Sequence, residues 1–162
     1  MKLSMAVLAV VLATTPASAQ WLYQGNESAF DDDGLHLAVT VSGRYGFGLR
    51  CRGKTTEAIY MTPDTSFDAD SYKLANISKP LMMIRVDDSP VIEIEVELID
   101  MDGKAAALGE VDPAVFAAAR DAKKRVAVAL KLLGTNYHEQ SFSARGSGNA
   151  LKKAIAACGL AE

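Results

Sequence analysis

The amino-acid sequence predicts an α+β domain that is mainly antiparallel β, in one sheet or a two-layer sandwich, with two helices. Apolar and polar residues alternate over most of the chain with a period of two, which is typical of half-buried strands. Two later segments carry helix start or stop signals. Cys51 and Cys158 lie near the two ends of the predicted domain, and a disulfide between them would fasten the C-terminal helix to the strands.

The first 19 residues have the pattern of a secretory signal peptide. Lys2 precedes an apolar run at 5–13, and small residues at 17–19 form a cleavage site. The apolar run is far shorter than the ~20 residues that a membrane-spanning helix needs. We therefore expect residues 1–19 to be removed and residues 20–162 to form a single domain in the periplasm, or secreted beyond it.

The chain is weakly acidic. Its 162 residues carry a formal net charge of −3, and loss of Lys2 with the signal peptide makes this −4. Proteins that bind nucleic acid or anionic membranes present basic surfaces, so the charge argues against both classes. No later segment has the ~20 apolar residues of a transmembrane helix, so none is predicted.

The first predicted strands form a hairpin. Residues 35–41 have apolar side chains at every odd position, and residues 45–51 alternate in the same way after a turn. In the second strand Cys51 shares a face with Tyr45 and Phe47, which points Cys51 inward. The next expected elements are a strand over 57–61 and a long loop over 65–80, which is rich in Ser, Asp and Asn.

The β pattern continues through the middle of the chain. Strands are predicted over 81–86, 91–99 and 104–109. In the second of them, apolar residues at even positions face one way and Glu93, Glu95 and Glu97 face the other. Asp102-Gly103 is a favoured tight-turn pair and would join the second strand to the third.

Start signals predict the first helix, from Asp112 to about Lys124. Asp112 suits the N-cap, Pro113 suits the first helical position, and Val111 could pack on Phe116 as a hydrophobic staple. Strands over 126–132 and 137–143 follow, joined by a turn at 134–136.

The second helix is predicted to begin at Asn149, as its N-cap, and to end at Gly159. Leu151, Ile155 and Cys158 recur at the spacing of one buried helical face. Cys158 therefore lies on a predicted core face, as does its counterpart in the early hairpin.

The two cysteines have one intramolecular pairing in an oxidising compartment. Closing a loop of about 100 residues would stabilise the fold by about 4–5 kcal/mol in the chain-entropy model. The alternative is a pair of free or reactive thiols, although no Cys-x-x-Cys spacing supports redox chemistry.

No residue pattern predicts a catalytic site, a metal site or a cofactor. Glu93, Glu95 and Glu97 fit a solvated sheet face, and His36 lies on the polar side of its strand without neighbours at metal-ligand spacing. His138 shares a face with Phe142, so we expect it to be partly buried and hydrogen-bonded. Acidic residues at 31–33 and at 64, 68 and 70 could bind a divalent cation weakly, but exposed loop acids are the commoner meaning.

A basic cluster is the strongest binding candidate. It consists of Arg120, Lys123, Lys124 and Arg125, at the end of the first predicted helix. Cations at this position complement the helix dipole. They could also form a patch for an anionic partner, such as a polysaccharide, a phosphate or an acidic protein surface.

Gly46 and Gly48 alternate on the outer face of their strand. They could admit a neighbouring chain or ring, although packing by Trp21 or another residue of this protein is the simpler explanation.

Several short motifs, in order along the chain, carry a resemblance to known families. They are Trp21, the Ser-Ala-Phe-Asp-Asp run at 28–32, the Leu-Arg-Cys run at 49–51, the Ile-Arg-Val-Asp run at 84–87, and Phe142 ahead of a final helix with Cys158. The chain resembles the type VI secretion-associated periplasmic accessory family (TagO-like) and, more distantly, invasion-associated locus B proteins. The resemblance implies a non-catalytic periplasmic domain that works through protein contacts. It carries over the paired cysteines as structural positions.

The leading expectation is therefore a non-catalytic exported accessory or interaction domain. Its partner would be another envelope protein, in an envelope or secretion assembly. The competing class is a small enzyme or enzyme inhibitor that acts on cell-wall material, through the basic helix end or a cleft near His138. The sequence leaves the oligomeric state open.

Overall fold

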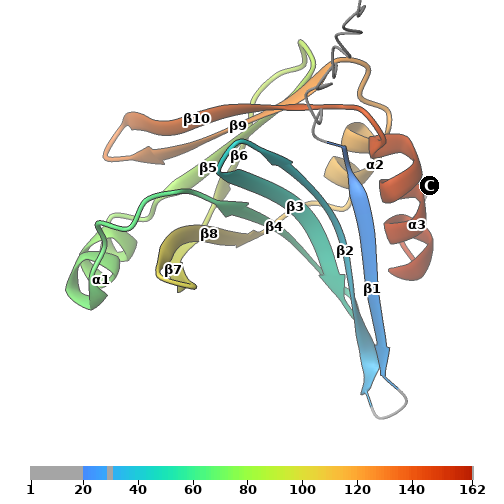
Figure 1. Cartoon of the computed structure of the whole chain (residues 1–162), viewed down its shortest axis with the longest axis horizontal. Coiled ribbons are helices and arrows are strands. Elements are labelled where there is room, and N and C mark those ends of the chain that lie inside the picture. The colour runs from blue at the N-terminus through green and yellow to red at the C-terminus, as the bar shows by residue number, and fades with distance from the viewer. Residues whose placement is uncertain (1–19, 29–30, 162) are drawn as a thin grey trace, which may run out of the picture.

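The computed structural model describes residues 20–28 and 31–161, which fold into ten strands and three helices (Figure 1). The predicted signal peptide lies outside the described residues. The strands are β1 (Leu22–Ser28), β2 (Asp31–Ser42), β3 (Tyr45–Arg52), β4 (Thr55–Met61), β5 (Leu81–Val86), β6 (Ile92–Glu95), β7 (Glu97–Met101), β8 (Lys104–Glu110), β9 (Arg125–Leu132) and β10 (Thr135–Ser143). The helices are α1 (Ala69–Ile77), α2 (Ala114–Arg120) and α3 (Ser147–Ala157).

The strands form two antiparallel sheets. One has the order β1-β2-β3-β4-β8-β7 and the other has the order β10-β9-β5-β6. The predicted α+β class is confirmed, in its two-layer form. Within the described residues, none of the helices has the length and apolar character needed to cross a membrane.

Aromatic side chains fill the space between the sheets. Phe47 of β3 and Tyr60 of β4 both contact Phe142 of β10, with ring centroids 5.9 and 6.2 Å apart. Trp21 packs edge-on against Phe47, and its indole N–H donates to the Ser143 carbonyl at 3.0 Å. Trp21 thus links the start of the described domain to the end of β10.

The segment predicted as one strand over 91–99 is divided between the sheets. β6 pairs with β5 in the four-stranded sheet, and β7 pairs with β8 in the six-stranded sheet, with the break at Val96. A Cβ on Gly109 of β8 would lie 2.4 Å from the Glu95 carbonyl oxygen, so the crossing needs glycine there. The glutamates of the segment are exposed, as predicted.

The strand β2 presents the opposite face to the core from the one its pattern indicates. Its even positions His36, Ala38 and Thr40 are buried, whereas Val41 is 54% exposed. The small side chains let α3 pack against β1 and β2. His36, expected on the polar side, is buried and satisfied by the Tyr23 hydroxyl, 2.9 Å from its Nδ1. The apolar odd positions therefore lie on the outside of the sheet.

The helix α2 ends at Arg120, earlier than the predicted Lys124. The N-cap of α2 is Pro113 and not the predicted Asp112, although the Asp112 carboxylate accepts a hydrogen bond from the Ala114 amide at 2.8 Å just before the helix. The buried residues of α2 are Val115, Phe116 and Ala119.

The helix α3 begins after Gly146 and not at Asn149, so that prediction is wrong. Gly146 has a φ of 80°, a left-handed turn that starts the helix early, and its carbonyl accepts from Ala150. The predicted end is confirmed. Gly159 has a φ of 62°, and Leu160 donates to the Ile155 carbonyl at 3.1 Å, the bond of a Schellman motif.

The disulfide between Cys51 and Cys158 is present. It joins β3 to the C-cap of α3 across 107 residues of sequence, with Cα atoms 6.0 Å apart. Cys51 is 1% exposed, so its predicted inward orientation is confirmed. The terminal helix is thereby cross-linked to the early strands.

Residues 65–80, expected to be a loop, contain the helix α1. The Asp68 carboxylate caps it by accepting from the Ser71 amide at 2.8 Å. The Asn76 side chain holds it on β7, donating to the Leu98 carbonyl at 2.9 Å and accepting from the Leu98 amide at 2.8 Å. Ala75 is its one buried residue, so the helix lacks the apolar stripe by which sequence patterns reveal helices.

Candidate functional site

A pocket of about 280 Å³ lies beside His138, where the two sheets meet near α1. Its walls come from β7, β8, β9, β10 and the segment that follows β4. The lining is mainly apolar and comprises Thr62, Asp64, Phe67, Leu98, Ala105, Leu130, Leu132, Tyr137 and His138. Asp64 supplies a carboxylate to it and His138 supplies an imidazole.

A β-bulge in β10 points His138 at this pocket. Tyr137 pairs with Leu130 and Gln140 pairs with Val128, so two residues of β10 face one residue of β9. His138 has a φ of 51°, in the left-handed region. Such backbone conformations cost about 1–3 kcal/mol in non-glycine residues and are retained where the surroundings enforce them. Bulges commonly redirect a side chain near a functional site.

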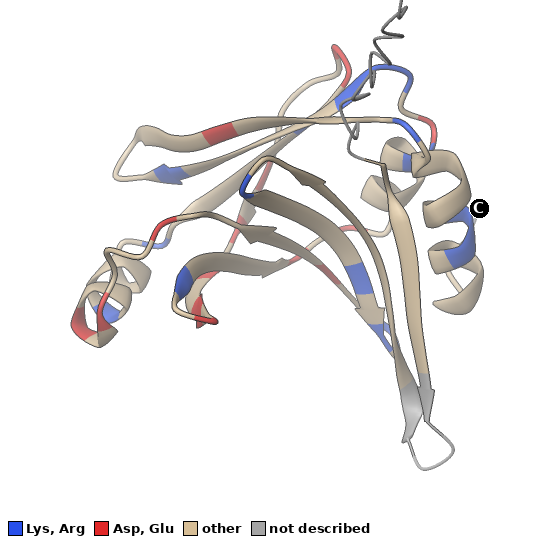
Figure 2. Cartoon of the chain, in the orientation of Figure 1, with Lys and Arg blue, Asp and Glu red and all other residues tan. Residues whose placement is uncertain are grey.

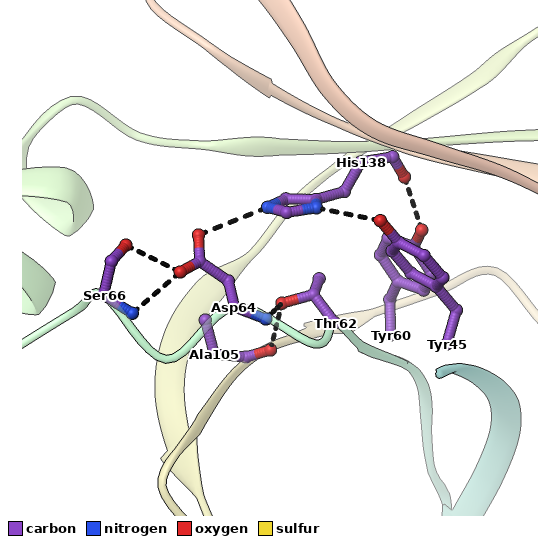
Figure 3. A network of polar contacts seen from close by, with 7 residues as sticks. All are labelled: Tyr45, Tyr60, Thr62, Asp64, Ser66, Ala105 and His138. Atoms are coloured by element: carbon purple, nitrogen blue, oxygen red, sulfur yellow. Dashed lines mark hydrogen bonds and ion pairs between the residues drawn. The ribbon is translucent and has the colours of Figure 1, made fainter. Parts of the chain in front are cut away.

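Three contacts hold His138 in place (Figure 3). Its Nε2 lies 3.3 Å from Oδ2 of Asp64, and its Nδ1 lies 3.3 Å from the Tyr45 hydroxyl. Its backbone carbonyl accepts a hydrogen bond from the Tyr60 hydroxyl. A neutral ring satisfies both side-chain contacts, because Nε2–H donates to the carboxylate and Nδ1 accepts from Tyr45.

The Asp64 carboxylate is held in its ionised form. The Ser66 hydroxyl and the Ser66 amide donate to Oδ1 at 2.6 and 2.8 Å. These bonds lower the pKa of Asp64, and the contact with His138 lowers it further, against a smaller opposing effect of burial. The pocket therefore has a fixed negative charge at its rim.

Two tyrosines complete the cluster. Burial raises the pKa of Tyr60 well above its usual value, and the neighbouring Tyr45 adds to the shift, so the Tyr60 hydroxyl remains a donor. The two rings stack with centroids 6.1 Å apart. Tyr45 of β3 and Tyr60 of β4 thus hold the strained β-bulge of β10 in place.

The arrangement orients an imidazole and a carboxylate at the mouth of an apolar hollow. Both ring nitrogens of His138 face side chains of this protein, and the Thr62 hydroxyl donates to the Ala105 carbonyl at 2.8 Å. Among the described residues, no three His, Cys, Asp or Glu side chains gather closely enough to hold a metal ion. The geometry suits binding of a group with an apolar body.

Exposed apolar side chains lie on two elements near the pocket. Leu74 and Ile77 of α1 are 72% and 78% exposed, and Leu133 and Tyr137 of the β9–β10 hairpin are 85% and 50% exposed. Both elements lie at the same end of the molecule (Figure 1). We call this region the pocket end, and define it as α1, the β7–β8 turn and residues 132–138.

The predicted basic cluster lies elsewhere, where α2 leads into β9, beside acidic positions (Figure 2). The Asp87 carboxylate accepts from the backbone amides of Lys123, Lys124 and Arg125 at 2.7, 2.7 and 2.9 Å. These bonds lower the pKa of Asp87.

Side-chain ion pairs also engage the cluster. The Lys124 ammonium pairs with Asp88 at 3.1 Å, and Arg120 makes two bonds to Asp121. Local carboxylates thus already face this cluster. Its binding of an anionic partner stays a prediction.

The other singled-out residues have structural partners. Glu93 pairs with Lys131 at 3.0 Å and Glu95 pairs with Lys79 at 3.8 Å, on the exposed face. Side chains of this protein cover the outer-face glycines. Met61 covers Gly46, and Leu37 and Ile59 cover Gly48.

His138 is partly buried and hydrogen-bonded, as expected from the sequence. The sequence pattern indicated Asp64 only as a weak cation ligand, and the structure places it against His138 and Ser66 instead. Tyr45 and Tyr60 were not recognised as members of the site, because they come from segments far from His138 in sequence. The Asp-x-Ser spacing of Asp64 and Ser66 is the available signal, since it predicts a side-chain-capped turn.

Comparisons with known proteins concern the fold. No family model matches the chain, and no curated protein matches it. The structure is similar to the crystal structure of invasion associated protein B from Bartonella henselae, with a TM-score of 0.55 and 13% sequence identity. The match covers 86% of this chain and 93% of that one. It agrees with the more distant of the two predicted resemblances, and the TagO-like resemblance stays a prediction.

Proposed function

We propose that this chain is an exported, non-catalytic accessory domain that binds another protein of the cell envelope through its pocket end. The observation that carries the proposal is a preformed apolar pocket at the end of the molecule where α1 and the β9–β10 hairpin carry exposed apolar side chains. Clustered apolar exposure of this kind marks interaction surfaces. Binding energy in protein interfaces concentrates where an anchor side chain fills a desolvated pocket.

The size of the pocket favours a side chain over a larger substrate. Small-molecule sites typically enclose about 300–1,000 Å³. The pocket beside His138, at about 280 Å³, falls just below that range. Tyr137, half exposed at its edge, is of the residue type that is enriched in protein interfaces.

The compartment belongs to the same proposal. A disulfide between Cys51 and Cys158 agrees with export, because such bonds persist in oxidising compartments. The predicted signal peptide and the periplasmic location rest on the sequence. The link to a secretion assembly, which the TagO-like resemblance implies, is tested by whether secretion components are encoded beside this gene.

Affinity capture from envelope extracts tests the proposal. The test variant combines Leu133→Ser with Tyr137→Ser. A matched control combines Leu22→Ser with Val39→Ser, which are cross-strand partners on the outside of the six-stranded sheet, at the opposite edge of that sheet from β7. We expect a partner that the wild type and the control retain and the test variant loses. If the test variant retained the partner and the control lost it, the interface would lie on the outside of the six-stranded sheet.

The alternative is a small enzyme or enzyme inhibitor acting on cell-wall material. The observation in its favour is the His138–Asp64 pair beside the pocket, since such a pair can exchange protons with a bound group. Turnover of cell-wall fragments by the wild type, lost in His138→Ala, together with no captured partner, would replace the interaction proposal.

A further inference from the structure

The lining of the pocket beside His138 is asymmetric in charge. Asp64 carries the one carboxylate among its described lining residues, and no lysine or arginine lines it. Leu98, Leu130 and Leu132 form apolar walls. An occupant therefore meets hydrocarbon along its length and a negative charge at the mouth.

The Asp64 carboxylate has capacity for a further donor. Its Oδ1 accepts both donors of Ser66, whereas Oδ2 has a single longer contact of 3.3 Å with His138. A carboxylate oxygen has two lone pairs, so Oδ2 can accept from an incoming cation. The side chain is 21% exposed, which leaves it reachable from the mouth.

The surroundings of the mouth are acidic and aromatic. Figure 2 shows acidic positions on α1 and on the β7–β8 turn. Asp100 and Asp64 both raise the pKa of Tyr72, after the larger effect of burial, which places two carboxylates near this ring. The Phe67 and Tyr72 rings lie 5.2 Å apart. Aromatic faces and carboxylates both attract cations.

Basic residues belong to the same end. Lys73 pairs with Asp70 at 3.3 Å on α1, Lys104 lies at the exposed start of β8, Lys79 follows α1, and Arg44 lies near the β7–β8 turn. The acidic residues of this end and of the segment before α1 are Asp64, Asp68, Asp70, Asp100 and Asp102. The attraction of the pocket for a cationic group therefore comes mainly from Asp64, the carboxylate that lines it.

We infer, on the basis of the proposed function, that the pocket takes a lysine or arginine side chain of the partner protein. The methylene groups lie along the leucine walls and the cationic head reaches Asp64 at the mouth. Long basic side chains bury their stems in this way while the charged end stays near water. A neutral apolar side chain would fill the walls but forgo the interaction with Asp64.

NMR titration of the oxidised, signal-free domain tests this inference. The probes are the N-acetyl, N-methylamide derivatives of lysine, norleucine and glutamate, which present a cationic, a neutral and an anionic side chain. We expect the lysine probe to shift amide signals of residues 62–67 and 130–138 and to bind about fivefold more tightly than norleucine, as partly exposed ion pairs allow. The glutamate probe should not bind.

Variants separate charge from shape. Asp64→Asn keeps acceptor oxygen for Ser66 and should reduce the affinity for the lysine probe to that for the norleucine probe. Asp88→Asn, an exposed acid that pairs with Lys124, is the matched control and should change neither. Equal affinity for lysine and norleucine in the wild type would overturn the inference, as would tighter binding of glutamate.

The outcomes also separate this inference from the proposed function. Partner capture that depends on Leu133 and Tyr137, without lysine preference in the pocket, overturns the basic-anchor inference alone. Lysine preference without any partner overturns the proposed function alone. Hexylammonium that binds more tightly than the lysine probe would assign the pocket to a free amine and overturn the side-chain assignment.

Discussion

His138 is the residue on which the candidate site depends. Its φ of 51° is costly for any residue with a Cβ, and its side chain and carbonyl are held by Asp64, Tyr45 and Tyr60. The sequence pattern places His138 on a strand. The bulge that redirects its side chain arises from the pairing of β10 with β9, and no glycine in the sequence indicates it. The strain is therefore a property of the tertiary structure.

Substitution of His138 separates the backbone strain from the side-chain contacts. His138→Ala and His138→Gly both remove the imidazole, but alanine keeps the unfavourable φ. We expect the glycine variant to be more stable by about 1 kcal/mol in urea unfolding. At Glu139, whose φ is not positive, the order should reverse, because glycine costs about 0.5–1 kcal/mol relative to alanine in a strand. An alanine variant at 138 as stable as the glycine variant would contradict the strain.

Asp87 makes the stability of the fold depend on pH, and the direction of this dependence follows from its lowered pKa. Hydrogen bonds from the amides of Lys123, Arg125 and Lys124 lower its pKa from the ordinary 3.8. A carboxyl group with a depressed folded-state pKa stabilises the fold above its unfolded pKa, and this stabilisation is lost as the pH falls through the folded value. Asp87 therefore contributes to the loss of stability below about pH 4.

Asp87→Asn should reduce the fall in Tm that accompanies a decrease from about pH 6 to pH 2. Part of this fall should remain, because the pKa values of Asp64, Asp68 and Asp121 are also lowered. Asp88→Asn is the matched control, since among the described residues Asp88 pairs with the Lys124 ammonium and not with backbone amides. If both variants reduced the fall in Tm equally, the result would contradict the role of the amide contacts of Asp87.

At the scale of elements, strands and turns with strong signals were predictable. The Asp102-Gly103 hairpin, the Asp112 side-chain contact at the start of α2 and the Gly159 end of α3 depend on local chemistry that the sequence carries. The face of β2 was not predictable, because the apolar face lies outside and the small face is covered by α3. The helix α1 was missed because its stability comes from Asn76 on β7 and not from an apolar stripe.

The crossing from β6 to β7 gives a prediction for Gly109. A Cβ there would meet the Glu95 carbonyl oxygen at 2.4 Å and a Val96 methyl at 2.8 Å. We expect Gly109→Ala to lower the free energy of unfolding by about 1–3 kcal/mol in urea unfolding. Gly148→Ala is the control, because it lies in the first turn of α3 with only one neighbour, at 3.5 Å. It should be neutral or stabilising. An equal loss of unfolding free energy in the two variants would contradict the close approach of Gly109 to the Glu95 carbonyl.

The disulfide gives a prediction for α3. Replacing Cys51 and Cys158 with alanine should destabilise the domain by about 2–5 kcal/mol, because the cross-link closes a long loop. Thermal unfolding with and without reductant provides the measurement. The double variant should be insensitive to reductant, whereas the wild type should lose stability when reduced. An unchanged melting temperature in the reduced wild type would contradict the role of the disulfide in holding α3.

At the scale of the whole molecule, the pocket is assembled from segments far apart in the chain. Asp64 follows β4, His138 lies in β10, and Leu98 comes from β7. No sequence window contains the site, so periodicity and motif spacing could supply the fold class but not this convergence. The basic cluster is the opposite case, because it is prominent in the sequence. In the folded chain, however, Asp87, Asp88 and Asp121 contact it.

We expect protein contacts to concentrate at the pocket end. The exposed apolar residues there belong to α1 and the β9–β10 hairpin. Leu22 and its cross-strand partner Val39 lie on the outside of the six-stranded sheet, on strands at the opposite edge of that sheet from β7. The two surfaces can therefore be compared directly in one experiment.

Site-specific photocrosslinking in intact cells that export the chain is the most direct test. A photoreactive phenylalanine replaces Tyr137 or Ile77 at the pocket end, and Leu22 or Val39 on the outer sheet face as controls. We expect one protein adduct of the same mass to form from both pocket-end positions and not from the controls. Adducts from the controls alone, or none from 137 and 77, would contradict the assignment of the pocket end as the interaction surface.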